Sequence, residues 1–130
     1  MDVGDPSNFV RILEIVGQDF SLLSQKLSAY SIDDSETMDA IRKVYKDYQY
    51  ILDPHAAVGY AALEKHLHDN AGSKGIVLST AHPVKFPEAV ETAIGKTVDI
   101  PPSLQPLLKK QKQALKMKAD YAIFKEYLMQ

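Results

Sequence analysis

The sequence has 130 residues, of which 15 are basic and 17 acidic, and none is a cysteine. This charge balance argues against nucleic acid or a polybasic membrane surface as a partner. The lack of cysteine excludes disulfides, thiolate metal sites and cysteine nucleophiles. No apolar run approaches the ~18 residues of a membrane span and no signal peptide opens the chain, so we expect no membrane partner and a cytoplasmic location.

Helix signals dominate the chain. Acidic or hydroxyl caps, prolines at first helical positions and apolar residues at helical spacing mark successive helices. The predicted helices cover approximately residues 5–16, 20–26, 33–48, 53–68, 87–94, 104–109 and 120–128. In the third of them an apolar stripe predicts the buried face, and it consists of Met38, Ile41, Val44, Tyr45 and Tyr48.

Strand signals are few. Residues 76–78 form a continuous apolar run that predicts a buried strand, and residues 27–32 alternate as a short strand would. A single buried strand cannot satisfy its own amides and needs neighbours. The sequence therefore predicts a helix-rich α/β fold with one or two strands and about six helices. We expect a single partial domain, 1–130, because the missing strands would lie in further sequence and the chain begins abruptly at a helix cap, as a cut fragment does.

Hydroxyl and imidazole side chains follow the predicted strand. Ser79, Thr80 and His82 stand at its carboxyl end, where open α/β sheets bind ligands. Hydroxyls in that position suit a ring nitrogen, a phosphate or a carboxylate, and Lys85 could pair with an anion. The alternative is a hydroxyl-stabilised turn that leads into a helix beginning at proline, with a solvated lysine.

A second motif, Asp53-Pro54-His55, opens the fourth predicted helix. An aspartate cap followed by proline explains the first two residues, but capping does not require the imidazole of His55. That histidine therefore either faces a ligand or is structural. His66 and His68 point to different faces of the same helix, which predicts two surface residues and no metal site.

Three motifs together resemble the C-terminal part of the threonine synthase family, in the branch found in many bacteria and in fungi. They are residues 1–9 (MDVGDPSNF), 53–60 (DPHAAVGY) and 78–86 (LSTAHPVKF), in the order and spacing of the family. The resemblance implies a pyridoxal-phosphate enzyme of the tryptophan-synthase-β structural class. Such an enzyme is a lyase of threonine biosynthesis that converts O-phosphohomoserine and water to threonine and phosphate.

The resemblance also implies roles for the residues already singled out. In this class a Ser or Thr hydroxyl at the end of a late strand meets the pyridine nitrogen of the cofactor, which matches Thr80 or, as the close alternative, Ser79. A neutral hydroxyl does not force that nitrogen to stay protonated. His55 and His82 would lie near the cofactor or substrate, toward the substrate phosphate together with Lys85.

Two parts that the family needs have no counterpart in these 130 residues: the Schiff-base lysine and the glycine-rich phosphate-binding loop. The chain alone is therefore expected to contribute no catalytic lysine, to hold pyridoxal phosphate weakly and to make no threonine. The alternatives are a stand-alone helical interaction module and a small phosphate-binding protein. We also expect an exposed sheet edge to drive self-association.

Overall fold

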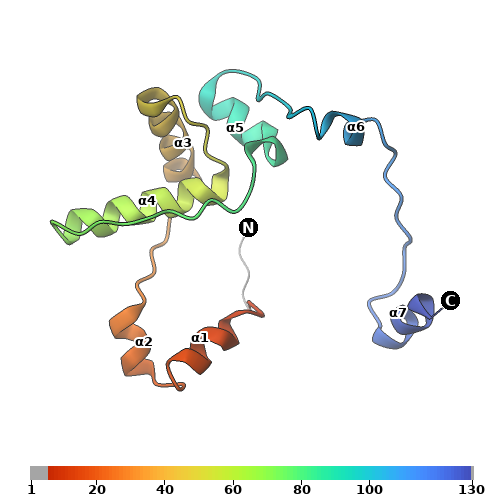
Figure 1. Cartoon of the computed structure of the whole chain (residues 1–130), viewed down its shortest axis with the longest axis horizontal. Helices are drawn as coiled ribbons and strands as arrows, with labels where there is room; N and C mark the ends of the chain where they lie inside the picture. Colours follow the sequence, from red (N-terminus) through yellow and green to blue (C-terminus); the bar gives the residue numbers. More distant parts are fainter. Residues whose placement is uncertain (1–5, 130) are drawn as a thin grey trace. The chain divides into compact units, whose positions relative to one another are not determined.

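The structure is a computed structural model that describes residues 6–129 (Figure 1). These residues divide into two compact units, one reaching to Val98 and the other beginning at Asp99. The helices and their bounds are α1 (Phe9–Ile15), α2 (Phe20–Lys26), α3 (Asp34–Tyr48), α4 (Pro54–Asp69), the 3-10 helix η1 (Pro83–Lys85), α5 (Pro87–Ile94), α6 (Gln105–Leu108) and α7 (Tyr121–Leu128). The prediction of one partial domain across residues 1–130 stays a prediction.

The predicted strands are wrong for the residues that the structure describes, which contain helices, turns and extended chain but no strand. Ile76 and Leu78, predicted to be buried, are 87% and 81% exposed. Residues 27–32 are likewise extended without strand pairing. The physical reason is that a strand exists only when a neighbour accepts its backbone hydrogen bonds, whereas a helix closes its own. The fold observed here is therefore helical.

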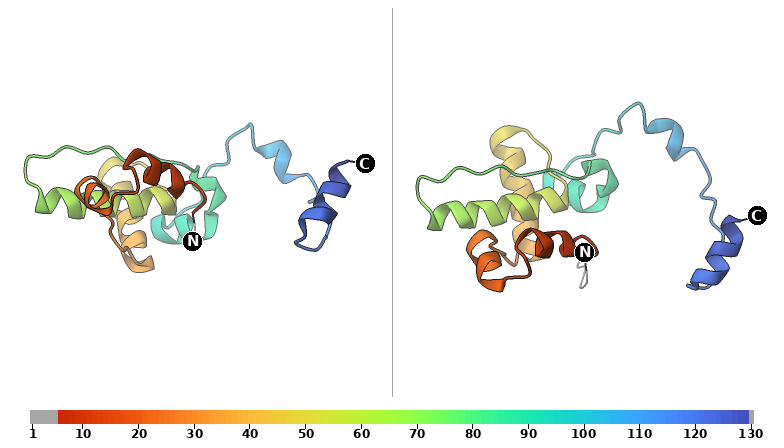
Figure 2. Two further views of the ribbon diagram at one scale, coloured as in Figure 1. Left: turned by 90° about the horizontal axis from the view of Figure 1, so that it is seen from below. Right: turned by 60° about the horizontal axis from the view of Figure 1, so that its bottom comes forward.

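The core of the first unit lies among α3, α4 and α5. Ile41 of α3, Ala57 of α4 and Val90 of α5 are fully buried. In both views of Figure 2, α3 crosses α4 and α5 lies near the N-terminal end of α4. The apolar stripe predicted for α3 supplies this face through Ile41 and Val44, but Tyr48 is exposed because it lies in the last turn of α3, beyond the packed region.

Local capping explains where these helices begin and end. The Asp33 carboxylate accepts a hydrogen bond from the Glu36 amide, and the Glu36 side chain accepts one from the Asp33 amide, which completes a capping box. Asp53 caps α4, with Pro54 at its first position. Gly95 ends α5 with φ 71°, a conformation that glycine adopts without strain. The helix boundaries predicted at these residues are confirmed.

An extended segment, residues 73–82, runs back along α4 (Figures 1 and 2). The backbone of Gly75 lies against the side chain of Leu63. Two residues further on, the Val77 side chain covers Gly59, where a Cβ atom would lie 3.4 Å from Val77 Cγ1. The small residues on this face of α4 therefore serve to bring an extended chain close to a helix.

The second unit contains α6 and α7. The Asp120 carboxylate accepts hydrogen bonds from the amides of Ala122 and Ile123, which confirms the predicted start of α7. The apolar side chains of α7, such as Phe124 and Leu128, are exposed. In the described part of the chain, no helix is both long enough and apolar enough to cross a membrane.

Candidate functional site

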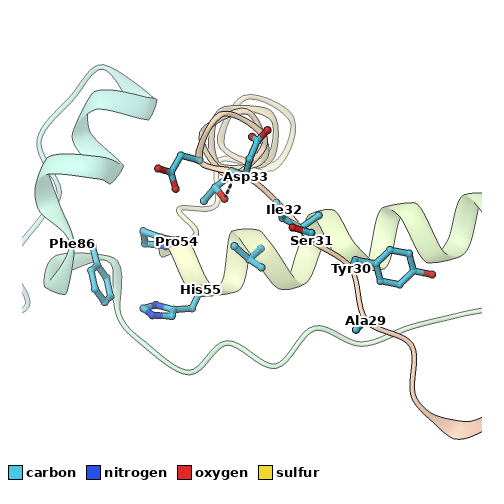
Figure 3. Close-up of a pocket in the computed structure, with 11 residues that line it drawn as sticks. Ala29, Tyr30, Ser31, Ile32, Asp33, Pro54, His55 and Phe86 are labelled. Atoms are coloured by element: carbon cyan, nitrogen blue, oxygen red, sulfur yellow. Dashed lines mark hydrogen bonds between the residues drawn. The ribbon is translucent and has the colours of Figure 1, made fainter. Parts of the chain in front are cut away.

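An open cleft of about 950 Å³ lies at the start of α4 (Figure 3). Its floor comes from the first turns of α4, one wall comes from the segment that precedes α3, and Phe86 closes one end. The lining residues are 29–34, Thr37, Pro54, His55, Val58 and Phe86. Residues from three separate stretches of sequence therefore meet at this place.

Side-chain bonds hold the wall segment against α4. The Tyr30 hydroxyl lies 3.0 Å from His66 Nδ1, and the Lys65 ammonium lies 2.6 Å from Glu36. Lys65 also donates to the Ser31 carbonyl oxygen at 3.4 Å. His66 is thus half-buried and bonded, which corrects the prediction that it is a surface residue; helix periodicity gave its direction but not its partner. His68 is exposed beside Asp69, as predicted.

Carboxylates at the α3 end of the cleft stay ionised. The pKa of Asp33 is lowered, first by the hydrogen bond from the Glu36 amide and then by the Ser35 hydroxyl. The pKa of Glu36 is also lowered, chiefly by its bond with Lys65. An anionic group in the cleft would be repelled by Asp33, which is one of its lining residues.

Asp53 and His55 form a linked pair at the start of α4. One carboxylate oxygen, Oδ1, accepts the His55 backbone amide at 3.0 Å and lies 3.0 Å from His55 Nδ1. The Asp53 side chain is completely buried, whereas that of His55 is 41% exposed. The second oxygen of Asp53, Oδ2, is buried and has no hydrogen-bond partner among the described residues.

The ring of Phe86 packs beside the ring of His55, as Figure 3 shows. The two ring centroids are 5.0 Å apart and the ring planes are inclined by 58°. An aromatic neighbour at this distance limits the rotation of the imidazole and keeps water from one side of it. Phe86 therefore restricts where the free edge of His55 can point.

The other predicted site residues lie on the extended segment and in η1. Ser79, Thr80, His82 and Lys85 are all exposed, and none of them lines the cleft described above. The Ser79 hydroxyl makes only a long 3.5 Å contact with the Ala81 carbonyl oxygen. The structure thus places His55 in the cleft and leaves the hydroxyls open to solvent beside it.

The pairing of residues between the extended segment and α4 relates the hydroxyls of the segment to His55 along the axis of α4. Gly75 lies at Leu63 and Val77 at Gly59, so two extended residues match four helical residues. The match follows from the rise of about 6.6 Å for two extended residues and about 6 Å for four helical ones. Two more residues at the same rise would bring Ser79 level with the first turn of α4, which carries His55.

His82 caps η1 at its N-terminal end and has the opposite hydrogen-bond arrangement to His55. Its Nδ1 accepts a hydrogen bond from the Val84 amide at 3.2 Å. A backbone amide can only donate, so His82 Nδ1 carries no proton and Nε2 carries it. The Pro83 turn agrees with the structural alternative considered for this motif, and it leaves an imidazole N–H directed away from the backbone.

Two features of the site were missed by sequence reasoning. Phe86 was quoted only as part of a motif, and its contact with His55 joins residues far apart in the chain. Asp53 was interpreted as a cap alone. Its spacing from His55 held the missing signal, because an aspartate cap reaches the residue two positions later. No group of three or more metal-ligating side chains lies close enough together to hold a metal ion within residues 6–129.

Comparison with known proteins gives a consistent result. Residues 56–128 match the family described as threonine synthase, C-terminal. The chain is 36% identical over 129 residues to threonine synthase of Escherichia coli (strain K12), a match that covers 99% of this chain and 29% of that protein. It is 40% identical over 92 residues to threonine synthase of Schizosaccharomyces pombe, covering 68% of this chain and 16% of that protein.

Solved structures agree. The crystal structure of threonine synthase from Escherichia coli has a TM-score of 0.79 at 35% identity, with 99% of this chain and 29% of that chain covered. PLP-bound threonine synthase from Brucella melitensis has a TM-score of 0.65 at 26% identity, covering 98% of this chain and 32% of that one. The family match and the solved structures thus place the chain among the threonine synthases and, within them, at the C-terminal region. It belongs to the threonine synthase family and spans about a third or less of the length of these relatives.

Proposed function

We propose that these 130 residues are the C-terminal part of a complete, cytoplasmic threonine synthase, which forms threonine and phosphate from O-phosphohomoserine and water. The observation that carries the proposal is the family match, which runs over 99% of this chain at 36% identity but takes in only 29% of the relative's length. The remaining sequence of such an enzyme would supply the lysine and the phosphate-binding loop that this chain lacks.

The cofactor of the proposed enzyme is pyridoxal phosphate, which when bound would act as an electron sink for the carbons of the substrate. The exposed hydroxyls of Thr80 and Ser79 suit its ring nitrogen, because they are neutral and make at most one long bond to the described chain. A hydroxyl can donate to or accept from a nitrogen without fixing its protonation state. We favour Thr80 as the partner of the ring nitrogen, with Ser79 as the alternative.

The substrate phosphate is assigned to the side of His55, His82 and Lys85. His82 presents an N–H group, and Lys85 lies three residues later in η1 with its side chain exposed. The ionised carboxylate of Asp33 also lines the cleft and would repel a phosphate from its own position. The N–H group of His82 and the side chain of Lys85 support a phosphate position close to η1.

The proposal is tested by the formation of threonine and phosphate from O-phosphohomoserine. The complete polypeptide that carries these residues should be active with pyridoxal phosphate, and the 130-residue chain should be inactive under the same conditions. In the complete polypeptide, Thr80→Val should lower kcat about tenfold or more, the factor of one hydrogen bond to a charged or developing group. Its melting temperature should change little because Thr80 is exposed here.

The matched control is Thr97→Val, the same exchange at another exposed threonine. It should leave turnover and the absorption spectrum of the bound cofactor unchanged. Ser79→Ala separates the two candidate partners, since only the hydroxyl that meets the ring nitrogen should alter that spectrum. Wild-type turnover in both Thr80→Val and Ser79→Ala would refute the assigned role, and saturable phosphate binding by the isolated chain would favour the phosphate-binding alternative.

A further inference from the structure

The carboxylate of Asp53 does more than cap a helix. Four aspartates cap helices within residues 6–129: Asp19, Asp33, Asp53 and Asp120. Three of them are exposed, whereas Asp53 retains only 1% of its surface. A cap needs one acceptor atom, which serine, threonine or asparagine provides without burying a charge. A buried carboxylate with an unpaired oxygen is costly, so its presence indicates a second role.

The second role follows from what a carboxylate can do. Oδ1 of Asp53 already accepts the His55 amide, so it acts as an acceptor and the ring nitrogen that faces it at 3.0 Å is the donor, which carries a proton. This holds for both the neutral and the charged imidazole. The nitrogen left for a ligand is therefore Nε2, which makes no hydrogen bond to the described residues. It belongs to a side chain that is 41% exposed and lines the cleft.

We propose that Asp53 is a positioning residue for the synthase reaction: its buried carboxylate holds His55 with a proton on Nδ1 and directs Nε2 at the substrate. The proposal rests on the proposed function above. In the neutral imidazole the bare Nε2 accepts a hydrogen bond from a substrate atom that bears a proton, and in the charged imidazole Nε2–H donates one to a phosphate oxygen. The ring of Phe86, 5.0 Å away, restrains the imidazole in the orientation that Asp53 selects.

His82 provides an internal comparison. Its Nδ1 accepts the Val84 amide, so its neutral form carries the proton on Nε2. His55 and His82 thus offer opposite groups to a ligand, a bare nitrogen and an N–H, at positions that both follow from local backbone geometry. The buried acid beside His55 is what distinguishes the two.

The direct test is nitrogen NMR of histidine-labelled complete polypeptide above the pH at which the imidazole loses its charge. His55 should show a protonated Nδ1 and a bare Nε2, and His82 the reverse. Asp53→Ser keeps an oxygen cap for α4 but is too short to hold the imidazole. In that variant His55 should lose its Nδ1–H preference. A wild-type His55 with its proton on Nε2, or no change in Asp53→Ser, would overturn the proposal.

Kinetics then separate positioning from folding. Asp53→Ser should lower kcat/KM for O-phosphohomoserine by roughly ten- to a hundredfold, the factor of one charge-assisted hydrogen bond. In a His55→Asn background, where the amide can replace Nδ1–H but not Nε2, the same change at Asp53 should cost little more. A full additional loss in the double variant would mean that Asp53 acts on the fold and would overturn the proposal.

Two controls keep the result decisive. Asp19→Ser makes the same exchange at an exposed cap and should leave kcat/KM unchanged. If Asp53→Ser does not fold, Asp53→Asn keeps the volume and the cap while removing the charge, and it should lose part of the same activity. A complete polypeptide that makes no threonine would refute the proposed function, while the tautomer of His55 would still report whether Asp53 sets the imidazole.

Discussion

The α3–α4–α5 core and the extended segment 73–82 have comparable apolar content, but the apolar side chains are buried in the core and largely exposed in the segment. In the core, Ile41 and Val90 are fully buried, and each helix satisfies its own backbone. In the segment, Ile76 and Leu78 are almost fully exposed, and their backbone forms no strand pairing with other residues of the range 6–129. The difference teaches that apolar sequence is stabilised here only where its hydrogen-bond partners are nearby in the chain.

The largest expected effect comes from truncating a buried side chain in the α3–α4–α5 core. Ile41→Ala should destabilise the chain by about 2–5 kcal/mol, because it leaves a cavity among three packed helices. Ile76→Ala, the same exchange in the extended segment, should change stability by less than about 0.5 kcal/mol in the isolated chain. Urea unfolding measures both. Equal effects would mean that the segment is packed in solution.

Charged substitutions test the role of the extended segment 73–82. The expected sheet edge is absent from residues 6–129, but the exposed apolar side chains of Ile76 and Leu78 can still drive association of the isolated chain, and Ile76→Lys with Leu78→Lys should abolish it. Sedimentation velocity at increasing concentration measures the result. Ile15→Lys is the control, since Ile15 is also highly exposed but lies on α1. A wild-type chain that stays monomeric at high concentration would contradict the expectation.

A smaller effect is expected where the extended segment contacts α4. Gly59→Ala should stabilise α4 by about 0.5–1 kcal/mol, since glycine weakens a helix interior. The new methyl group would lie 3.4 Å from Val77 Cγ1, an ordinary contact. Thermal unfolding measures the gain. Gly95→Ala should do the reverse because Gly95 has φ 71°. A loss of stability in Gly59→Ala would mean that the segment lies closer to α4 than described.

The smallest expected effect is a pH dependence at the start of α3. Folding lowers the pKa of Asp33 and Glu36, so the stability they contribute is present above 4.5, the ordinary pKa of a glutamate, and is lost as the pH falls through their lower folded values. The urea concentration at the midpoint of unfolding should decrease as the pH is lowered from neutral to about pH 3. That fall should be smaller in Asp33→Asn but not in Asp47→Asn, a change elsewhere on α3.

The sequence was sufficient to predict the helices because their signals are local. Asp33, Pro54 and Gly95 each act within one turn, so the boundaries they predict are confirmed. The buried strand at 76–78 was wrong because burial depends on partners that no local pattern contains. The continuous apolar run identified the side chains of Ile76 and Leu78 but not what would cover them.

The same distinction governs the site. His55 could be singled out because capping left it unexplained, and it does lie in the cleft. The contact of Phe86 with His55 and that of Tyr30 with His66 could not be predicted, since each joins separate segments through tertiary packing. The roles of Ser79, Thr80, His82 and Lys85 toward cofactor and substrate stay predictions. Residue chemistry suggested them, and only their positions are now described.

The short connection between α3 and α4 has a consequence for the order of events in folding. Gln49 ends α3 with φ 55°, and Pro54 begins α4 a few residues later, so the two helices meet across a short connection between consecutive elements. Contacts of this kind form early and fast. We therefore expect α3 and α4 to pack together while residues 76–78 are still exposed. Lys74, beside that apolar run, is the kind of gatekeeper charge that limits aggregation during such a delay.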